Sequence, residues 1–313
     1  MEGSQLKVAE WTPEHQKREL KRRLESMVSV MRRENPTNYQ PLPDDVIVAV
    51  PNKHGTTWLL HICHQIRMKG QEPDFEDQFD VVGWIEASER AFGVDMSTKP
   101  QAAKPRVFLT HLPYAQIPAG GKRVYCFRNQ KDMVVSAYYF LDSVLLLNGR
   151  VSMPVFATAI LQRVKNNLND LLLWWEHRHD DNVLLVFFDD LKEDHEGGVH
   201  QIAKFMDVKL DEDAIARVVH TTSHAEMSRQ ASKFTVRKAI FKIREAFGEA
   251  CPPSLDSEFV SRVRKDDGKS GEGKQKLPVE VQQHIDQMWQ DIVTSKLGFK
   301  DLKEMREVWR KEY

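Results

Sequence analysis

Cysteine is scarce in this chain, which has three among its 313 residues: Cys63, Cys126 and Cys251. An odd number of cysteines at these separations fits neither a disulfide framework nor the closely spaced ligands of a metal site. Cys63 and Cys126 lie in apolar patterns, so we expect both to be reduced core residues, as is usual in the cytoplasm.

Long apolar runs are also absent. No run approaches the ~18 residues that a membrane-spanning helix needs, and residues 2–33 are too polar and charged for a secretory signal. The net charge is −1, from 45 basic and 46 acidic residues, so no overall field draws the chain to nucleic acid or to a membrane. These absences predict a soluble, cytoplasmic protein in which any recognition of phosphate is local.

A local phosphate site is indicated by residues 51–58. An apolar run at 46–50, typical of a buried parallel strand, precedes them, and an amphipathic helix pattern follows. Free backbone N–H groups at a helix start, together with the helix dipole, bind anions. Gly55 allows close approach of the backbone, Thr56 and Thr57 add donors, and Lys53 adds a positive charge. The stretch therefore predicts an anion cradle.

The order of residues in this loop differs from a Walker A motif. There the Lys directly follows the second Gly, whereas Lys53 stands two residues before Gly55 and Trp58 closes the run. Taken alone, the stretch is also compatible with an ordinary helix start.

Strand and helix patterns alternate along the chain. Further strands are expected at 106–110, 123–127 and 183–188, and helices at about 13–33, 156–175 and 192–206. Such alternation predicts an α/β fold with a central parallel sheet flanked by helices. Ligands of such sheets bind beyond the carboxyl ends of the strands, where the sequence places the 53–57 loop, His111 and Arg128. Arg128 with Ser136, eight residues on, would form a second phosphate clamp, although Arg128 could instead pair with Asp132 on the surface.

These motifs resemble the cytosolic-type sulfotransferases, which use 3′-phosphoadenosine 5′-phosphosulfate (PAPS). The family's first loop, Tyr-Pro-Lys-Ser-Gly-Thr-Thr-Trp, is similar to residues 50–58, and its Thr-His-Leu-Pro matches 110–113. Its Arg-Asn-Pro-Lys-Asp-x-x-x-Ser matches 128–136 with the spacing intact. Segments resembling two further family motifs lie at 188–194 and 268–274. The resemblance spans roughly residues 44–300, with five motifs in order.

The resemblance implies transfer of a sulfuryl group from PAPS to an alcohol, phenol or amine of a small molecule, without a metal. His111 would be the general base, and Lys53 would stabilise the departing phosphate. Trp58 would stack on adenine, and Arg128 with Ser136 would hold the 3′-phosphate. The residues implied to contact PAPS are Lys53, His54, Gly55, Thr56, Thr57, Trp58, Arg128, Ser136, Thr222, His224, Arg264, Lys265 and Gly268.

The chain departs from the family pattern at several positions. Leu109 stands where many animal members have a Lys, His54 replaces a loop Ser, and His224 replaces an aromatic Phe. Two extra residues separate Arg264-Lys265 from Gly268, so either could reach the 3′-phosphate. The family's dimer motif is only partly present after Lys274, which favours a monomer or a weak dimer.

We expect one sulfotransferase domain over residues 1–313. About the first 35 residues would form a peripheral charged helix, and 223–275 would form a cap and cofactor-loop region. Two alternatives stay open: a small-molecule or nucleotide kinase, with Asp189 or Asp190 holding magnesium, and a catalytically silent nucleotide-binding protein.

The acceptor is not specified by the motifs. Aromatic residues in 75–92, 138–147 and 228–262 suit an apolar or aromatic acceptor. A set of basic residues in the last of these segments could instead suit an acidic acceptor or form a solvated helix face: Lys233, Arg237, Lys238, Lys242 and Arg244.

Overall fold

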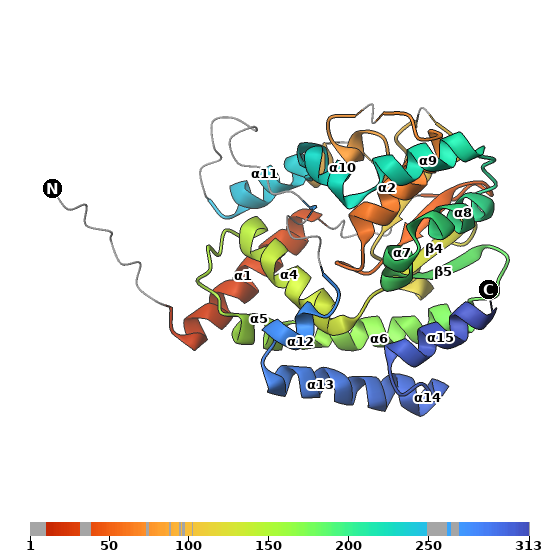
Figure 1. Cartoon of the computed structure of the whole chain (residues 1–313). Helices are drawn as coiled ribbons and strands as arrows, with labels where there is room; N and C mark the ends of the chain where they lie inside the picture. Colours follow the sequence, from red (N-terminus) through yellow and green to blue (C-terminus); the bar gives the residue numbers. More distant parts are fainter. Residues whose placement is uncertain are drawn as a thin grey trace.

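The computed structural model describes residues 11–31, 39–72, 75–87, 89–93, 95, 98–101, 103–248, 262–263 and 269–312. Helices and strands alternate through these residues (Figure 1). The helices are α1 (Pro13–Met31), α2 (Thr56–Arg67), α3 (Glu89–Phe92), α4 (Gln130–Val144), α5 (Met153–Ala159), α6 (Leu161–Glu176), α7 (Phe188–Glu193), α8 (His195–Phe205), α9 (Glu212–Thr221), α10 (His224–Arg229), α11 (Arg237–Ala246), α12 (Glu272–Lys276), α13 (Val279–Trp289), α14 (Ser295–Leu297) and α15 (Leu302–Glu312).

The centre of the described structure is a parallel sheet of five strands in the order β2-β3-β1-β4-β5. The strands are β1 (Val46–Ala49), β2 (Gly83–Trp84), β3 (Val107–Thr110), β4 (Lys122–Phe127) and β5 (Val183–Phe187). Ala49 pairs with Thr110 on one side and Tyr125 on the other, so the carboxyl ends of the three central strands meet at one edge. The short edge strand β2 carries too few residues to give a sequence pattern.

Helices cover both faces of this sheet. In Figure 1, α2 and α9 lie above the sheet, and α6, α13 and α15 lie below it. All residues of β1, β3 and β5 are buried, as expected for parallel strands between helical layers. The predicted α/β class with a flanked parallel sheet is therefore confirmed. Cys63 and Cys126 are buried free thiols in the core, while Cys251 lies outside the described residues.

Two helices that the sequence presented as continuous are each divided. The 156–175 pattern forms α5 and α6, which meet at Ile160, where ψ is 7°. The 192–206 pattern belongs to α7 and α8, because Asp194 leaves the helical conformation and its side chain accepts a hydrogen bond from the N–H of Gly197. This N-cap starts α8 afresh. Strand β5 also ends one residue early, since Phe188 opens α7.

The expected N-terminal helix is α1, which packs against α11 and α5. Leu20 and Val30 are buried, and Arg23 donates from Nη1 to the carbonyl of Leu145 at 2.6 Å. These contacts join the amino-terminal helix to the loop that follows α4. They bring the carboxyl end of α1 beside the cavity described next. None of the described helices is long and apolar enough to cross a membrane.

Candidate functional site

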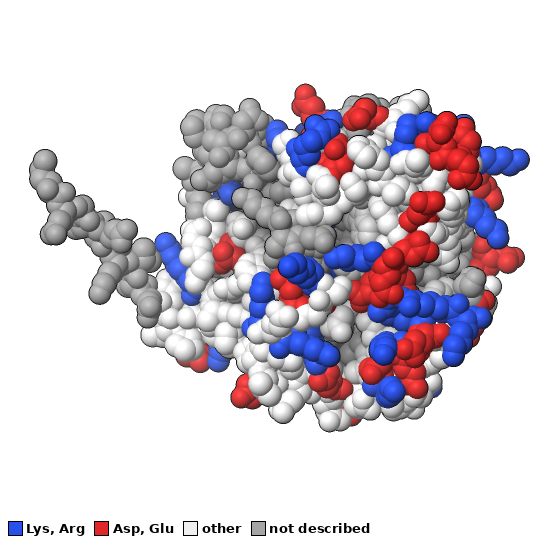
Figure 2. Space-filling model, viewed as in Figure 1, with Lys and Arg blue, Asp and Glu red and all other residues white. Residues whose placement is uncertain are grey.

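A cavity of about 480 Å³ opens beyond the carboxyl ends of the strands. Polar groups from the loop after β1, from the end of β3 and from α4 line one part of it, and apolar residues of α1 and α11 line another. This is the position at which parallel α/β sheets bind ligands. On the face shown in Figure 2, acidic and basic side chains are interspersed, so this face carries no large patch of one sign.

The loop after β1 takes a shape that a side chain at its glycine would not permit. Gly55 has φ of 96°, and a Cβ there would lie 2.7 Å from Cδ2 of Phe188. Helix α2 starts directly afterwards, and no side chain caps its start among the described residues. Its first N–H groups and the side chains of Lys53 and Thr57 border the cavity. The loop and the start of α2 therefore have the arrangement that the predicted anion cradle requires.

The side chain of Lys53 reaches from this loop to α4. Its Nζ is 4.0 Å from the centroid of the Phe140 ring on α4. This cation–π contact extends the side chain over the cavity. The positive charge therefore faces the same space as the N–H groups of α2.

His111 follows β3 and faces the same cavity. Its Nδ1 lies 2.5 Å from the carbonyl of Val50, so Nδ1 carries the proton and Nε2 carries a lone pair. Burial lowers the pKa of His111 to about 3, and Arg262, Arg163 and Lys53 add to this against the Val50 contact. The ring is therefore neutral near pH 7.

Glu86, which the sequence analysis did not single out, fixes the backbone beside His111. One carboxylate oxygen accepts the N–H of His111 at 2.6 Å, and the other accepts the hydroxyl of Thr110 at 2.8 Å. Burial raises the pKa of Glu86 against these hydrogen bonds. The Trp84 ring meets the His111 ring edge-on at 5.2 Å. Glu86 and Trp84 thus hold the end of β3 from the side of the neighbouring strand β2.

Arg128 and Ser136 line the cavity on its α4 side, and both are buried. The guanidinium of Arg128 lies 4.4 Å from the centroid of the Phe188 ring. Ser136 follows two turns into α4, so both polar groups come from one strand–helix junction. The expected pairing of an Arg with a Ser hydroxyl is compatible with this arrangement.

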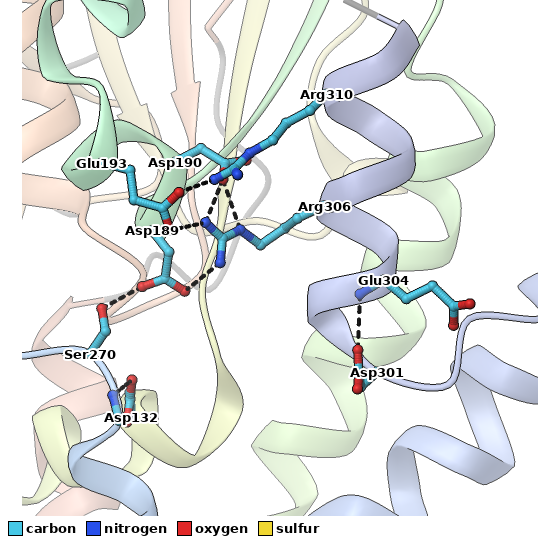
Figure 3. Close-up of polar contacts among 10 residues, drawn as sticks. Asp132, Asp189, Asp190, Glu193, Ser270, Asp301, Glu304, Arg306 and Arg310 are labelled. Atoms are coloured by element: carbon cyan, nitrogen blue, oxygen red, sulfur yellow. Dashed lines mark hydrogen bonds and ion pairs between the residues drawn. The ribbon is translucent and has the colours of Figure 1, made fainter.

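Asp132 joins the late part of the chain to this junction. It is 2% exposed, so it is not part of a surface ion pair. Its two oxygens accept the N–H groups of Gly271 and Gly273, each at 2.8 Å. A Cβ on Gly273 would lie 2.4 Å from Cβ of Lys131, so only glycine allows this approach. Nearby, Ser270 donates to Asp189 at 2.5 Å (Figure 3).

Trp58 forms part of an aromatic wall next to Arg128. Its Nε1 donates to the carbonyl of Thr222 at 2.8 Å, and its ring packs near Phe188 and His195. The hydroxyl of Thr222 donates to the Val218 carbonyl, so the Thr222 side chain faces its own helix. His224 borders the cavity beside this wall.

His54 lies under the loop, in a position that the sequence did not indicate. Its ring is fully buried, with Nδ1 3.1 Å from the carbonyls of Pro51 and Asn52. Nε2 accepts from Gln130, whose own oxygen accepts from Asn167 at 3.0 Å. Burial lowers the pKa of His54 to about 3. The side chain braces the loop from below and does not line the cavity.

The comparisons with known proteins settle the family. Residues 43–306 match the sulfotransferase domain family. The chain belongs to this family. Human sulfotransferase 1E1 is 30% identical over 209 residues, which cover 64% of this chain and 71% of the human protein. The rabbit amine sulfotransferase is 26% identical over 265 residues, which cover 79% and 80%.

Solved structures show the same fold. Retinol dehydratase, solved with retinol and PAP, gives a TM-score of 0.62 at 20% identity, covering 87% of this chain and 86% of that one. Mouse sulfotransferase SULT7A1, solved with PAP, gives 0.60 at 19%, covering 92% and 94%. The predictions of fold, family and enzyme class are confirmed: this is a PAPS-dependent sulfotransferase.

The kinase alternative required Asp189 or Asp190 to hold magnesium, but both carboxylates contact arginine side chains instead. Asp190 accepts hydrogen bonds from Arg306 and Arg310 of α15, and Arg306 Nη1 lies 3.8 Å from Asp189 (Figure 3). These contacts fasten α15 to α7. No group of residues that could hold a metal ion occurs in the described part of the chain. Arg264, Lys265 and Gly268 lie outside the described residues.

Proposed function

We propose that the sulfuryl donor lies along the polar part of the cavity, which we call the cofactor end (Lys53, Gly55, Trp58, Arg128 and Ser136). The uncapped start of α2 and Lys53 would hold the 5′-phosphosulfate, because both supply positive electrostatic potential to one space. Arg128 and Ser136 would hold the 3′-phosphate. The separation of two cationic groups along one cavity supports a ligand with two anionic ends.

Positions around these groups would complete the cofactor end. Trp58 and His224 would contact adenine, and the carbonyl of Thr222 would orient Trp58 through its 2.8 Å hydrogen bond. His54 would act as a positioning residue for the loop. As the family resemblance implies, Arg264, Lys265 and Gly268 would extend the 3′-phosphate site.

His111 would be the general base. The observation that carries this assignment is the Val50 contact, which leaves the Nε2 lone pair for an acceptor proton. In the reaction, Nε2 takes the proton of the acceptor O–H or N–H, and the acceptor atom forms a bond to sulfur. The bond from sulfur to the 5′-phosphate oxygen breaks, and that oxygen keeps the electron pair beside Lys53. Binding of the anionic donor opposes the cations that lower the pKa of His111, which makes Nε2 a stronger base when PAPS is present.

We call the part of the cavity on the other side of His111 the acceptor end. The acceptor would bind there. The walls of this end come from α1 (Met27, Met31), α11 (Ile240, Ile243) and Met227. These apolar walls favour a small alcohol, phenol or amine with an extended apolar body. Retinol and androsterone occupy solved structures of retinol dehydratase, and molecules of that character would fit such walls.

The remaining expectations are part of the same proposal. Residues 1–313 would form one sulfotransferase domain with 223–275 as its cap and cofactor-loop region. The enzyme would act in the cytoplasm as a monomer or weak dimer.

Arg128→Ala tests the orientation of the donor. We expect the affinity for 3′,5′-bisphosphoadenosine to fall about a hundredfold, because a buried charge-assisted contact is lost. The affinity for adenosine 5′-monophosphate should change little, since this ligand has no 3′-phosphate. Isothermal calorimetry with both ligands measures the difference, and equal losses for the two would contradict the assignment.

A further inference from the structure

Arg262 lines the cavity and lies outside the five motif segments given above. Its backbone N–H donates to the carbonyl of Phe234 at 2.8 Å, and its guanidinium lies 5.4 Å from the centroid of the Phe79 ring. Phe79 stacks on Trp84, which packs on His111. This chain of ring contacts connects Arg262 to His111, and the charge of Arg262 helps to lower the pKa of His111.

The Arg262 side chain is partly exposed, but its Nη1 is buried. Its Nη1 has no hydrogen-bond partner within the part of the chain that the structure describes. Among the described residues, the acidic group that acts on Arg262 is Asp77, whose oxygens already accept hydrogen bonds from Phe79, Thr235 and Val236. A buried guanidinium with an unpaired N–H is costly, because its hydration is lost without replacement.

Glu86, the acidic residue among the described ones that line the cavity, does not pair with Arg262. Both oxygens of Glu86 accept hydrogen bonds from the end of β3, namely from Thr110 and His111. Arg163 of α6 adds a second positive charge to the surroundings of His111. Within the described part of the chain, the cavity therefore combines the apolar walls of α1 and α11 with a guanidinium Nη1 that has no partner.

We propose that Arg262 binds an anionic group of the acceptor, so that the preferred acceptors are apolar alcohols or phenols that carry a carboxylate or a similar acid. The acid group would pair with the guanidinium, and the apolar body would lie between α1 and α11. The hydroxyl would then reach Nε2 of His111. This inference rests on the proposed function of the cavity.

The test compares para-hydroxyphenylhexanoate with its methyl ester, two acceptors that share a phenol and differ in charge. For the natural chain, kcat/KM should be at least about tenfold higher for the carboxylate. In Arg262→Gln that ratio should fall about tenfold or more, chiefly through KM, and Arg262→Lys should restore part of it. Calorimetry should show the same loss in binding of the carboxylate to the enzyme–PAP complex.

Lys238→Gln is the matched control, because Lys238 lies near Arg262 in the chain but its side chain is 67% exposed and 3.9 Å from Asp80. It should leave the ratio unchanged. Equal turnover of acid and ester by the natural chain would overturn the proposal. So would an equal loss of kcat for both acceptors in Arg262→Gln, which would assign the charge to the donor. Failure of the proposed function is distinct: a folded, PAP-binding protein would then transfer nothing to either acceptor or to para-nitrophenol.

Discussion

At the cofactor end, a loop backbone of fixed shape and contacts with aromatic rings position the polar residues, whereas the acceptor end is enclosed mainly by side chains of separate helices. The loop at Gly55 depends on a left-handed φ and on the close approach of Phe188. The opposite wall depends on α1 and α11 lying side by side. The loop at Gly55 therefore tolerates little change in residue type or spacing. The wall formed by α1 and α11 tolerates many apolar residues of suitable size.

This difference implies that the chemistry and the choice of acceptor are separable. Residues of the cofactor end should alter donor binding or the chemical step for every acceptor. Residues of the acceptor end should alter the ranking of acceptors and leave donor binding unchanged. Each of the following substitutions tests one side of that division.

The largest effect is expected for His111→Ala, at the boundary of the two ends. Loss of a general base lowers kcat by roughly 10²–10⁴-fold, while the affinity for 3′,5′-bisphosphoadenosine should stay within about twofold. Steady-state kinetics and calorimetry measure the two quantities. His177→Ala is the control, because His177 stacks on Tyr114 outside the cavity. Unchanged turnover in His111→Ala would remove the assignment of the base.

The cofactor end was largely predictable because its geometry is local. An anion cradle needs a strand, a glycine and a helix start in consecutive positions, so the spacing marks Lys53, Gly55 and Thr57 as candidates. Their roles are implied by the family resemblance. His111 and Arg128 follow from the rule that parallel strands end at one edge. The role of His54 was not predictable, since the partners that bury it, Gln130 and Asn167, are remote in the chain.

The acceptor end was largely unpredictable because its geometry depends on packing between segments that are remote in the chain. Nothing in the sequence of α1 indicates that Met27 and Met31 border a cavity, because this depends on how α1 packs against α11. The short strand β2 gives no periodic pattern, and so Glu86 was not recognised as a support of His111. Arg262 likewise acquires its position from contacts with Phe234 and Phe79.

An intermediate effect is expected for Asp132→Asn, which tests whether the late loop belongs to the cofactor end. The amide can accept only one of the two N–H groups of Gly271 and Gly273, and its own N–H₂ opposes the other. Loss of about one charge-assisted hydrogen bond should weaken 3′,5′-bisphosphoadenosine about tenfold. Adenosine 5′-monophosphate should bind as before. Both affinities can be measured by calorimetry.

Asp286→Asn is the control for this variant. It removes the 2.7 Å ion pair with Lys131 at the same end of α4, but the Asp286 side chain is 63% exposed. Such pairs contribute little to stability, so neither affinity should change. If Asp132→Asn weakened both nucleotides equally, the loop would be supporting the fold in general and not the 3′-phosphate.

The smallest effect is expected for Met31→Trp, which enlarges the wall that α1 presents to the acceptor. Met31 borders the cavity one helical turn after Met27, so a larger ring should shorten the space for the apolar body of the acceptor. KM should rise a few-fold for long acceptors and stay nearly constant for para-nitrophenol, with bisphosphoadenosine affinity unchanged. Ser29→Trp places the same ring at an exposed position of α1 and should have no such selectivity. If Met31→Trp lowered turnover of short and long acceptors alike, the two ends of the cavity would not be independent, because a change in the α1 wall would then have reached the chemical step.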